Sequence, residues 1–438
     1  MSRMKVGTIP VALIVIFVLY AIGRIFSSLP AINRPRDLAD TDAYLRISRE
    51  ALVDQDFWAG TRPLVFPLLL KITRQDLQLA SAIQLGISIL AWGFLACIVS
   101  RFIRPPLLQI AAFSWILALS LDRHISGWDF VMMSESLSLS LLAIFIGVSL
   151  WLLESWRIYI IVLLLAIGLL LALTRDTNAW LLLIFAMLLT IAVLFKLVGS
   201  RTLVIVAGLS VIFLVSSANA NKGYRWVFPL GNVIGQRILP YGSPFRYFEK
   251  CGMPVSPRLI DLAGQFANAQ ERAFFEDPEL EPFRQWMMEN GRSCYMSWLV
   301  SHPIDSLQVV FLRFDELISF SSVDGYFSRA YDPLMPVALG KLFYPECFSF
   351  WIWIFTTLTA LVGTWLQFWK DNKLWAGLIF INLSFLPHIF ISWHGDAMAP
   401  ARHALTVGGQ LYLSFSLFGI LALERFWVAR IKGSPAVK

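Results

Sequence analysis

Long apolar runs limit most strongly what this chain can fold into. A helix needs about 20 mostly apolar residues to cross a hydrocarbon core of about 30 Å. The chain of 438 residues contains about ten runs of roughly that size, at 8–28, 78–100, 105–121, 130–153, 158–173, 179–195, 202–217, 348–369, 374–393 and 408–428. The sequence therefore predicts an all-α polytopic membrane protein with about ten transmembrane helices.

The composition excludes a soluble globular protein. Hydrophobic residues make up 57% of the chain and charged residues only 15%, whereas soluble domains usually contain about 25% charged residues. The first run, 8–28, has no small-residue cleavage site and is too long for the core of a signal peptide. We expect it to stay attached as the first span.

The basic residues predict how the helices are oriented. With the N-terminus in the cytoplasm, the cytoplasmic side carries thirteen basic residues and three acidic ones, the bias expected of cytoplasmic loops. The basic ones are Arg3, Lys5, Arg101, Arg104, Arg157, Lys196, Arg201, Lys370, Lys373, Arg425, Arg430, Lys432 and Lys438. We expect both termini in the cytoplasm of a plasma (inner) membrane. This bias explains the net charge of +7 without a nucleic-acid partner.

The same topology places every long connection on the outer side and divides the chain into three parts. An N-terminal transmembrane module, residues 1–217, holds seven spans and a helical outer loop at 30–77. A large extracytoplasmic segment follows at 218–347, and a C-terminal module, residues 348–438, holds three more spans. We expect the outer connections to converge at one mouth of the bundle.

The large segment mixes aromatic and charged residues and is expected to be folded. Its stretch 304–320 is amphipathic and charged, which favours an interfacial helix over a further span. Cys251 and Cys294 could form a disulfide in an oxidising compartment, with Cys347 as a competing partner. No outer loop contains an Asn-x-Ser/Thr acceptor for glycosylation, so a bacterial membrane is favoured.

Two acids in the first outer loop are candidates for chemistry. Asp40 and Asp42 follow the first span closely. A carboxylate there could serve as the general base for an acceptor hydroxyl, or the pair could share a divalent cation such as Mg²⁺ or Mn²⁺. The alternative is that an aspartate caps a helix that begins near Tyr44.

Ionisable groups also stand at the edges of spans, where burial makes them costly unless they face a polar interior. They are Glu135, Arg175 and Arg402 with the adjacent His403. Arginine suits phosphate binding, because its planar fork donates two hydrogen bonds and keeps its charge. The alternative is that Arg175 pairs with Asp176 or Glu135 only to hold helices together. His388, deep in an apolar run, is expected to be a hydrogen-bonded packing residue.

These short elements, in this order, resemble the GT-C superfamily of membrane glycosyltransferases, which includes protein O-mannosyltransferases and the lipid A aminoarabinose transferase. The matching stretches are Asp40 to Tyr44, Arg62-Pro63 to Leu70, Ser134-Glu135-Ser136-Leu137, Thr174 to Asn178, and Arg402-His403. The chain departs from the family pattern at Ser136 and Asp176, where prolines are usual, and at His403, where a tyrosine is usual. These departures bear on the subfamily and the substrate.

The resemblance implies transfer of a sugar from a polyprenyl-phosphate donor to a hydroxyl of a glycan, lipid or protein acceptor, with inversion. It implies Asp40, or else Asp42, as the general base and Arg175 and Arg402 as donor phosphate ligands. Supporting roles are expected for Tyr44, Arg62, His124, Glu135, Asn178 and His403. No cofactor beyond the divalent cation is expected.

Two other classes of function stay open at this point. A multispan transporter or lipid flippase would also place charges inside a bundle, although such proteins often show inverted repeats and broken spans. A non-catalytic assembly or anchoring protein is the third class. Release of polyprenyl phosphate from a sugar-loaded carrier would separate the enzyme from both.

Overall fold

The protein is helical wherever its structure is described. The structure is a computed structural model that describes residues 8–267, 269–318, 323–343 and 348–433. Within these ranges there is no β-strand beyond an isolated bridge between Arg36 and Val131. The predicted all-α class is therefore confirmed for the described part of the chain.

Seven helices of the described ranges are long and apolar enough to cross a membrane. They are α1 (Thr8–Ile32), α5 (Leu77–Arg101), α8 (Glu135–Glu154), α10 (Asp176–Leu194), α11 (Leu203–Lys222), α23 (Leu374–Gly395) and α25 (Leu405–Gly433). The other three predicted spans correspond to apolar helices of 15 to 17 residues, which are α6 (Pro106–Leu121), α9 (Ile158–Ala172) and α21 (Ser349–Trp365). The chain is a helical multi-pass membrane protein.

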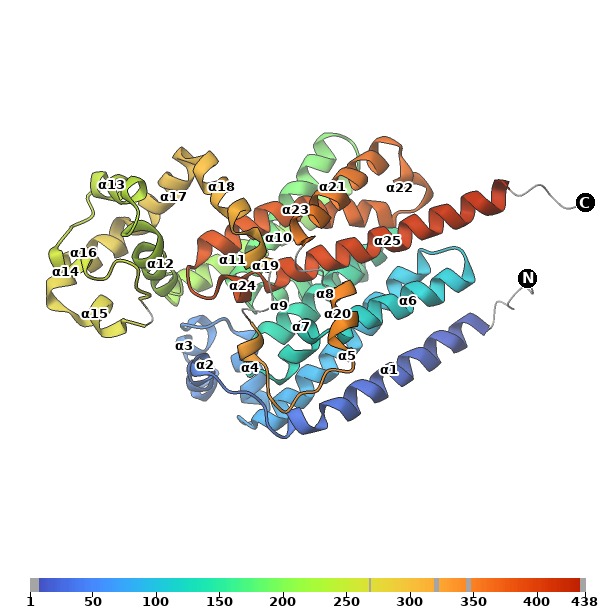
Figure 1. The fold of residues 1–438 in the computed structure, drawn as a ribbon, viewed down its shortest axis with the longest axis horizontal. Helices are drawn as coiled ribbons and strands as arrows, with labels where there is room; N and C mark the ends of the chain where they lie inside the picture. The colour runs from blue at the N-terminus through green and yellow to red at the C-terminus, as the bar shows by residue number, and fades with distance from the viewer. Residues whose placement is uncertain (1–7, 268, 319–322, 344–347, 434–438) are drawn as a thin grey trace, which may run out of the picture.

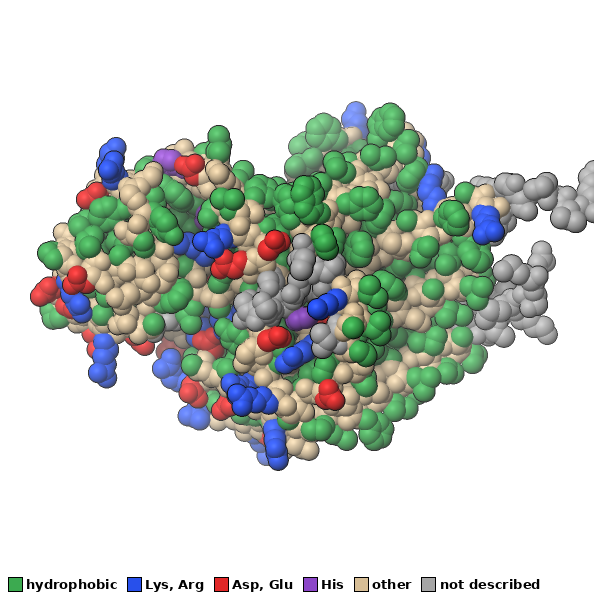
Figure 2. Space-filling model, viewed as in Figure 1, with side chains coloured by type: hydrophobic (Ala, Val, Ile, Leu, Met, Phe, Trp, Pro, Cys, Tyr) green, Lys and Arg blue, Asp and Glu red, His purple; other side chains and the backbone are tan. Residues whose placement is uncertain are grey.

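The long helices form a bundle along the long axis of the molecule (Figure 1). Helix α1 begins and α25 ends at the same end of this bundle. The opposite end carries the large segment, including α12 (Val227–Val233) and α17 (Arg292–Ser301). Figure 2 shows hydrophobic side chains over most of the visible bundle surface and many of the charged side chains nearer the large segment and first loop. This distribution suits a bundle surrounded by lipid.

Small residues let neighbouring helices approach closely. A Cβ atom on Gly93 of α5 would lie 2.3 Å from the Phe17 ring of α1. One on Gly147 of α8 would lie 2.7 Å from the Phe94 ring of α5. Glycine at these points therefore permits the close helix contacts that stabilise membrane bundles.

Buried polar side chains tie the C-terminal helices together. The Asn382 amide in α23 donates to the Ser414 hydroxyl of α25 at 2.6 Å and accepts from the Thr356 hydroxyl of α21 at 3.0 Å. His388 Nδ1 lies 2.6 Å from Gln410 Oε1 of α25. The interpretation of His388 as a hydrogen-bonded packing residue is confirmed.

The connection between α6 and α8 turns back into the bundle as α7 (Arg123–Ser126) and the 3-10 turn η1 (Gly127–Phe130). Asp129, in this connection, is 1% exposed and pairs with Arg24 of α1, which is 0% exposed. The fourth span, expected from residue 130, begins only at Glu135. Non-helical backbone is tolerated here because it is buried in protein. The backbone N–H and carbonyl of Arg36, in the first loop, donate and accept hydrogen bonds with this stretch.

The first loop is helical, as predicted, and forms α2 (Ala39–Arg49), α3 (Gln55–Ala59) and α4 (Val65–Ile72). The capping interpretation of its acids is wrong. Leu38 takes the N-cap position, and its N–H donates to the Thr41 hydroxyl at 2.9 Å. Asp40 and Asp42 therefore lie inside the first turn, where the positive end of the helix dipole favours a carboxylate.

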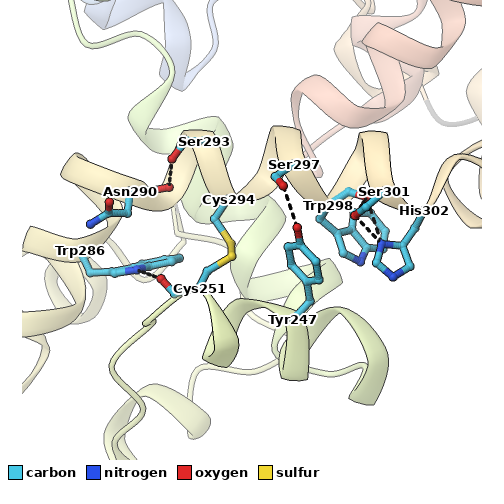
Figure 3. Close-up of a disulfide and its surroundings, with 10 residues drawn as sticks. All are labelled: Tyr247, Cys251, Trp286, Asn290, Ser293, Cys294, Ser297, Trp298, Ser301 and His302. Carbon is cyan, nitrogen blue, oxygen red and sulfur yellow. Dashed lines mark hydrogen bonds between the residues drawn. A yellow bond between two sulfur atoms is a disulfide. The ribbon is translucent and has the colours of Figure 1, made fainter.

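The large segment has a hydrophobic core of its own, built around residues such as Phe248, Phe283 and Trp286. A disulfide joins Cys251, at the end of α13 (Gly242–Lys250), to Cys294 of α17 (Figure 3). The third candidate, Cys347, lies outside the described residues. The Trp286 indole donates to the Cys251 carbonyl at 3.1 Å, which fixes the turn beside the bridge.

The large segment rests on the end of α23. The His394 ring lies between the Tyr295 hydroxyl, at 2.9 Å from Nδ1, and the Ser306 carbonyl, at 3.0 Å from Nε2. The expected interfacial helix at 304–320 is two helices, α18 (Pro303–Leu312) and α19 (Phe314–Ile318), with a break at Arg313. Its last two positions lie outside the described residues.

Candidate functional site

Five charged side chains from distant parts of the sequence meet near one end of the bundle, and we call them the charged cluster. Asp40 Oδ1 lies 2.6 Å from Arg62 Nη2, and Asp40 Oδ2 lies 2.6 Å from Arg402 Nη1. Glu135 Oε1 lies 3.0 Å from Arg175 Nη1 and 3.7 Å from Arg402 Nε. Arg402 therefore contacts both acids.

Helix ends bring these side chains together. Asp40 and Glu135 lie in the first turns of α2 and α8, where the helix dipole stabilises a carboxylate. Arg175 directly precedes α10, and Arg402 lies in α24 (Pro400–His403), a short helix before α25. Charges placed at helix ends avoid the cost of burial among lipid chains.

A second set of contacts holds the Arg175 guanidinium in place. Arg175 Nη1 also donates to the Arg402 carbonyl at 3.3 Å, and Arg175 Nη2 lies 2.9 Å from His403 Nδ1. Arginine is only a donor, so His403 Nδ1 accepts and the ring proton is on Nε2. Arg175 is 10% exposed and Glu135 is 2% exposed, so water screens this pair weakly.

Asp396 lies behind His403 and was not predicted as a site residue. Its Oδ2 is 3.4 Å from His403 Nε2, and its Oδ1 accepts from the Asn232 amide of α12 at 2.9 Å. This contact links the charged cluster to the large segment. The available signal was an acid placed directly after an apolar run.

The charged cluster changes the acidity of its members. Burial alone would raise the pKa of Asp40, but the Arg402 and Arg62 guanidiniums outweigh it and hold that pKa below its ordinary value. Burial would lower the pKa of Arg402, but Glu135 and Asp40 raise it. Burial lowers the pKa of His403 despite Asp396. Asp40 is thus ionised, Arg402 charged and His403 neutral near pH 7.

Several buried polar atoms around the charged cluster have no hydrogen-bond partner. They are Glu135 Oε2, Arg402 Nε, His403 Nε2, Asn178 Oδ1 and Thr177 Oγ1. Leaving one such group unsatisfied typically costs about 1–3 kcal/mol. A pocket of about 60 Å³ beside Arg402 is lined by Glu316, Val323, Tyr326, Ala399, Pro400 and Ala401. Of the five residues with unpartnered atoms, Arg402 also lines this pocket.

Two further predicted residues lie against the charged cluster. The Tyr44 hydroxyl is 3.4 Å from the Ser134 hydroxyl, and the Arg62 guanidinium lies 5.6 Å from the centre of the Tyr44 ring. Asn178 donates to the Ser138 hydroxyl at 2.6 Å and to the Thr174 hydroxyl at 3.0 Å. Tyr44 thus supports Arg62, and Asn178 ties α10 to α8.

The remaining predicted residues have other contacts. His124 Nδ1 is 2.6 Å from Asp122 Oδ1, and its ring centre lies 6.4 Å from that of Phe327. Asp42 is exposed and makes no ion pair among the described residues. Residues two apart on a helix do not face each other, so Asp42 does not join Asp40.

Asp176 does not pair with Arg175. It accepts two hydrogen bonds from Arg225, at 3.0 and 2.9 Å. Arg225 also donates to the Gly60 carbonyl at 3.3 Å and so connects the first loop to α10. These contacts of Arg225 were not predicted, because a basic residue directly after a span is common and its position in the sequence does not indicate its partners.

Within the described ranges, no group of three or more His, Cys, Asp and Glu side chains is arranged to hold a metal ion. The charged cluster contains three guanidiniums and two carboxylates, so it carries one net positive charge. Planar guanidiniums match phosphate oxygens in geometry, and a carboxylate can accept a proton from a hydroxyl. The arrangement can therefore bind an anion and remove a proton beside it.

Comparison with known proteins adds no family to this picture. No model of a known protein family matches the chain, and no curated protein matches it. The likeness to the GT-C superfamily rests on the short motifs.

Proposed function

We propose that the protein is a membrane glycosyltransferase that moves a sugar from a polyprenyl-phosphate donor to an acceptor hydroxyl. The observation that carries this proposal is the meeting of Asp40 and Glu135 with Arg62, Arg175 and Arg402. These five residues come from the stretches that resemble the superfamily. A lipid donor would reach such a site from the bilayer around the bundle.

In the proposed reaction, the acceptor oxygen attacks the anomeric carbon of the donor sugar. The bond between that carbon and the phosphate oxygen breaks, and its electron pair leaves with the phosphate. The hydroxyl proton passes to the Asp40 carboxylate. Arg175 and Arg402 stabilise the charge that develops on the leaving phosphate, since both are largely shielded from water. The products are an inverted glycoside and polyprenyl phosphate.

The proposal includes ten spans, with α6, α9 and α21 completing the crossings, and a site on the extracytoplasmic side of a bacterial plasma membrane. The positive-inside bias supports this orientation. Phosphatase reporters fused after Gly60 and Gly264 are expected to be active, and one fused at Lys370 inactive. A cytoplasmic signal from the Gly264 fusion would contradict the orientation.

Purified protein, incubated with a sugar-loaded polyprenyl phosphate and an acceptor extract, is expected to release polyprenyl phosphate. Asp40→Asn keeps the side-chain shape but removes the proton acceptor, so turnover should fall by about 10² to 10⁴. Asp56→Asn, an exposed acid in α3 of the same loop, is the matched control and should keep its activity. If the protein instead moves the intact lipid carrier from one leaflet of a vesicle membrane to the other without sugar transfer, a flippase would be favoured.

A further inference from the structure

The Asp40 carboxylate divides its two oxygens between two arginines. Oδ1 contacts Arg62 and Oδ2 contacts Arg402, each at 2.6 Å. The Arg402 contact uses only Nη1, while Nε is buried without a hydrogen-bond partner. A guanidinium can donate two parallel hydrogen bonds to a phosphate. One carboxylate oxygen therefore uses only part of what Arg402 can donate.

Asp40 and an incoming phosphate would compete for Arg402. Arg402 is 12% exposed and Asp40 is 23% exposed, so repulsion between two anions on this guanidinium is screened weakly. The donor phosphate is a diester with one negative charge, like a carboxylate, but it can engage a second N–H group of Arg402. The product polyprenyl monophosphate can do the same and carries up to about two negative charges. The second hydrogen bond favours either phosphate over the single oxygen of Asp40.

Asp40 would not be left alone by the exchange. Arg62 lies between α3 and α4 and is 31% exposed, so it remains a partner of Asp40 in a more solvated position. The exchange therefore breaks one of two ion pairs and replaces it with a stronger one. Glu135 Oε1 lies 3.0 Å from Arg175 Nη1, so Glu135 has a closer partner than Arg402.

We propose that Asp40 acts as an internal anion on Arg402 and that a phosphate ester displaces it while Arg62 retains it. This inference rests on the proposed function, in which the phosphate belongs to the donor. The Arg402 guanidinium has the largest effect among the groups that lower the pKa of Asp40. When Asp40 loses its contact with Arg402, it therefore becomes a better proton acceptor. This change occurs only after the donor is bound.

The test is the affinity of the purified full-length protein for a polyprenyl monophosphate. Asp40→Asn removes the competing charge, so this lipid should bind at least about tenfold more tightly, which corresponds to about 1.4 kcal/mol. If Asp40 merely positioned Arg402, the same variant would bind more weakly. Asp42→Asn makes the same charge change two residues away and should leave the affinity within about twofold of wild type.

Two other ligands identify what the site recognises. Polyprenol has the same chain without the phosphate, and inorganic phosphate lacks the chain. Tighter binding of the lipid phosphate alone assigns the site to a lipid headgroup, and tighter binding of both phosphates assigns it to phosphate in general; either supports the exchange. Three results would overturn the exchange: binding of the lipid phosphate by Asp40→Asn that is no tighter than that by wild type, the same gain in affinity in Asp42→Asn, or binding of polyprenol as tight as that of the lipid phosphate.

Asp40→Ala provides a second variant that also lacks the charge, and melting temperatures check that both variants are folded. Adding Arg402→Gln to Asp40→Asn should abolish the gain in affinity, because the gain acts through Arg402. The two proposals can fail separately. If Asp40→Asn binds the lipid phosphate more tightly but the wild type transfers no sugar, the glycosyltransferase is refuted and the role of Asp40 as an internal anion stands. If the wild type transfers sugar but Asp40→Asn binds the lipid phosphate more weakly, the internal anion is refuted and the glycosyltransferase stands.

Discussion

Replacing Arg24 with methionine should destabilise the bundle strongly. Arg24 Nη1 donates to the Ser120 carbonyl at 2.8 Å, and Nη2 contacts Asp129. Asp129 also accepts from the Ser136 hydroxyl at 2.5 Å. Both members of the ion pair are almost fully buried. Removing one member of such a pair leaves an uncompensated charge and typically costs about 3–5 kcal/mol.

With an unfolding entropy of about 2.1 cal/mol/K per residue, a 4 kcal/mol loss in a chain of 438 residues lowers the melting temperature by about 4 °C. The assay is thermal unfolding of the protein in detergent. Arg101→Met is the control, because Arg101 and Glu154 form an exposed pair worth about 0–1 kcal/mol.

The double variant Arg24→Met with Asp129→Leu should recover most of the loss, since replacing a whole buried ion pair with apolar residues is often neutral or stabilising. Equal melting temperatures for Arg24→Met and Arg101→Met would refute the reasoning. So would a double variant with the summed loss of the two single changes.

Three further results are expected. Arg175→Lys and Arg402→Lys should each weaken binding of polyprenyl phosphate by about tenfold or more, because lysine cannot donate a bidentate pair; unchanged affinity and turnover would leave both arginines a purely structural role. His403 has a lowered pKa when folded, so its contribution to stability should be lost as the pH falls from about 6.5 through that lower value; His403→Gln should flatten the melting temperature in that range. Replacing Cys251 and Cys294 by serine opens a loop with a sequence separation of 43, for which chain entropy gives a loss of up to about 4 kcal/mol; an unchanged melting temperature would contradict this.

Much of the fold was predictable because lipid imposes a simple rule on sequence. A long apolar run almost has to be a helix in a bilayer, and the described residues bear out that class. The failures lie where the chain departs from straight crossings. The link that carries Asp129 is an example, because hydropathy does not show that this link turns back into the bundle to meet Arg24.

The charged cluster was predictable in its members but not in its contacts. Charges at span edges pointed to Asp40, Glu135, Arg175 and Arg402, and the structure brings all four together. Which acid meets which arginine depends on how four helix ends pack, and sequence spacing does not fix this. Asp396 was missed for the same reason, since its partner His403 is set by the turn before α24.

The pairing of Asp40 with Arg402 joins residues 362 positions apart. Membrane helices are made in order from the N-terminus, and N-terminal parts of a chain generally fold first during synthesis. The first loop must therefore wait for nearly the whole chain before its acid meets this arginine. A molecule truncated before α24 would hold Asp40 and Glu135 without Arg402, so a complete charged cluster also shows that synthesis had passed α24.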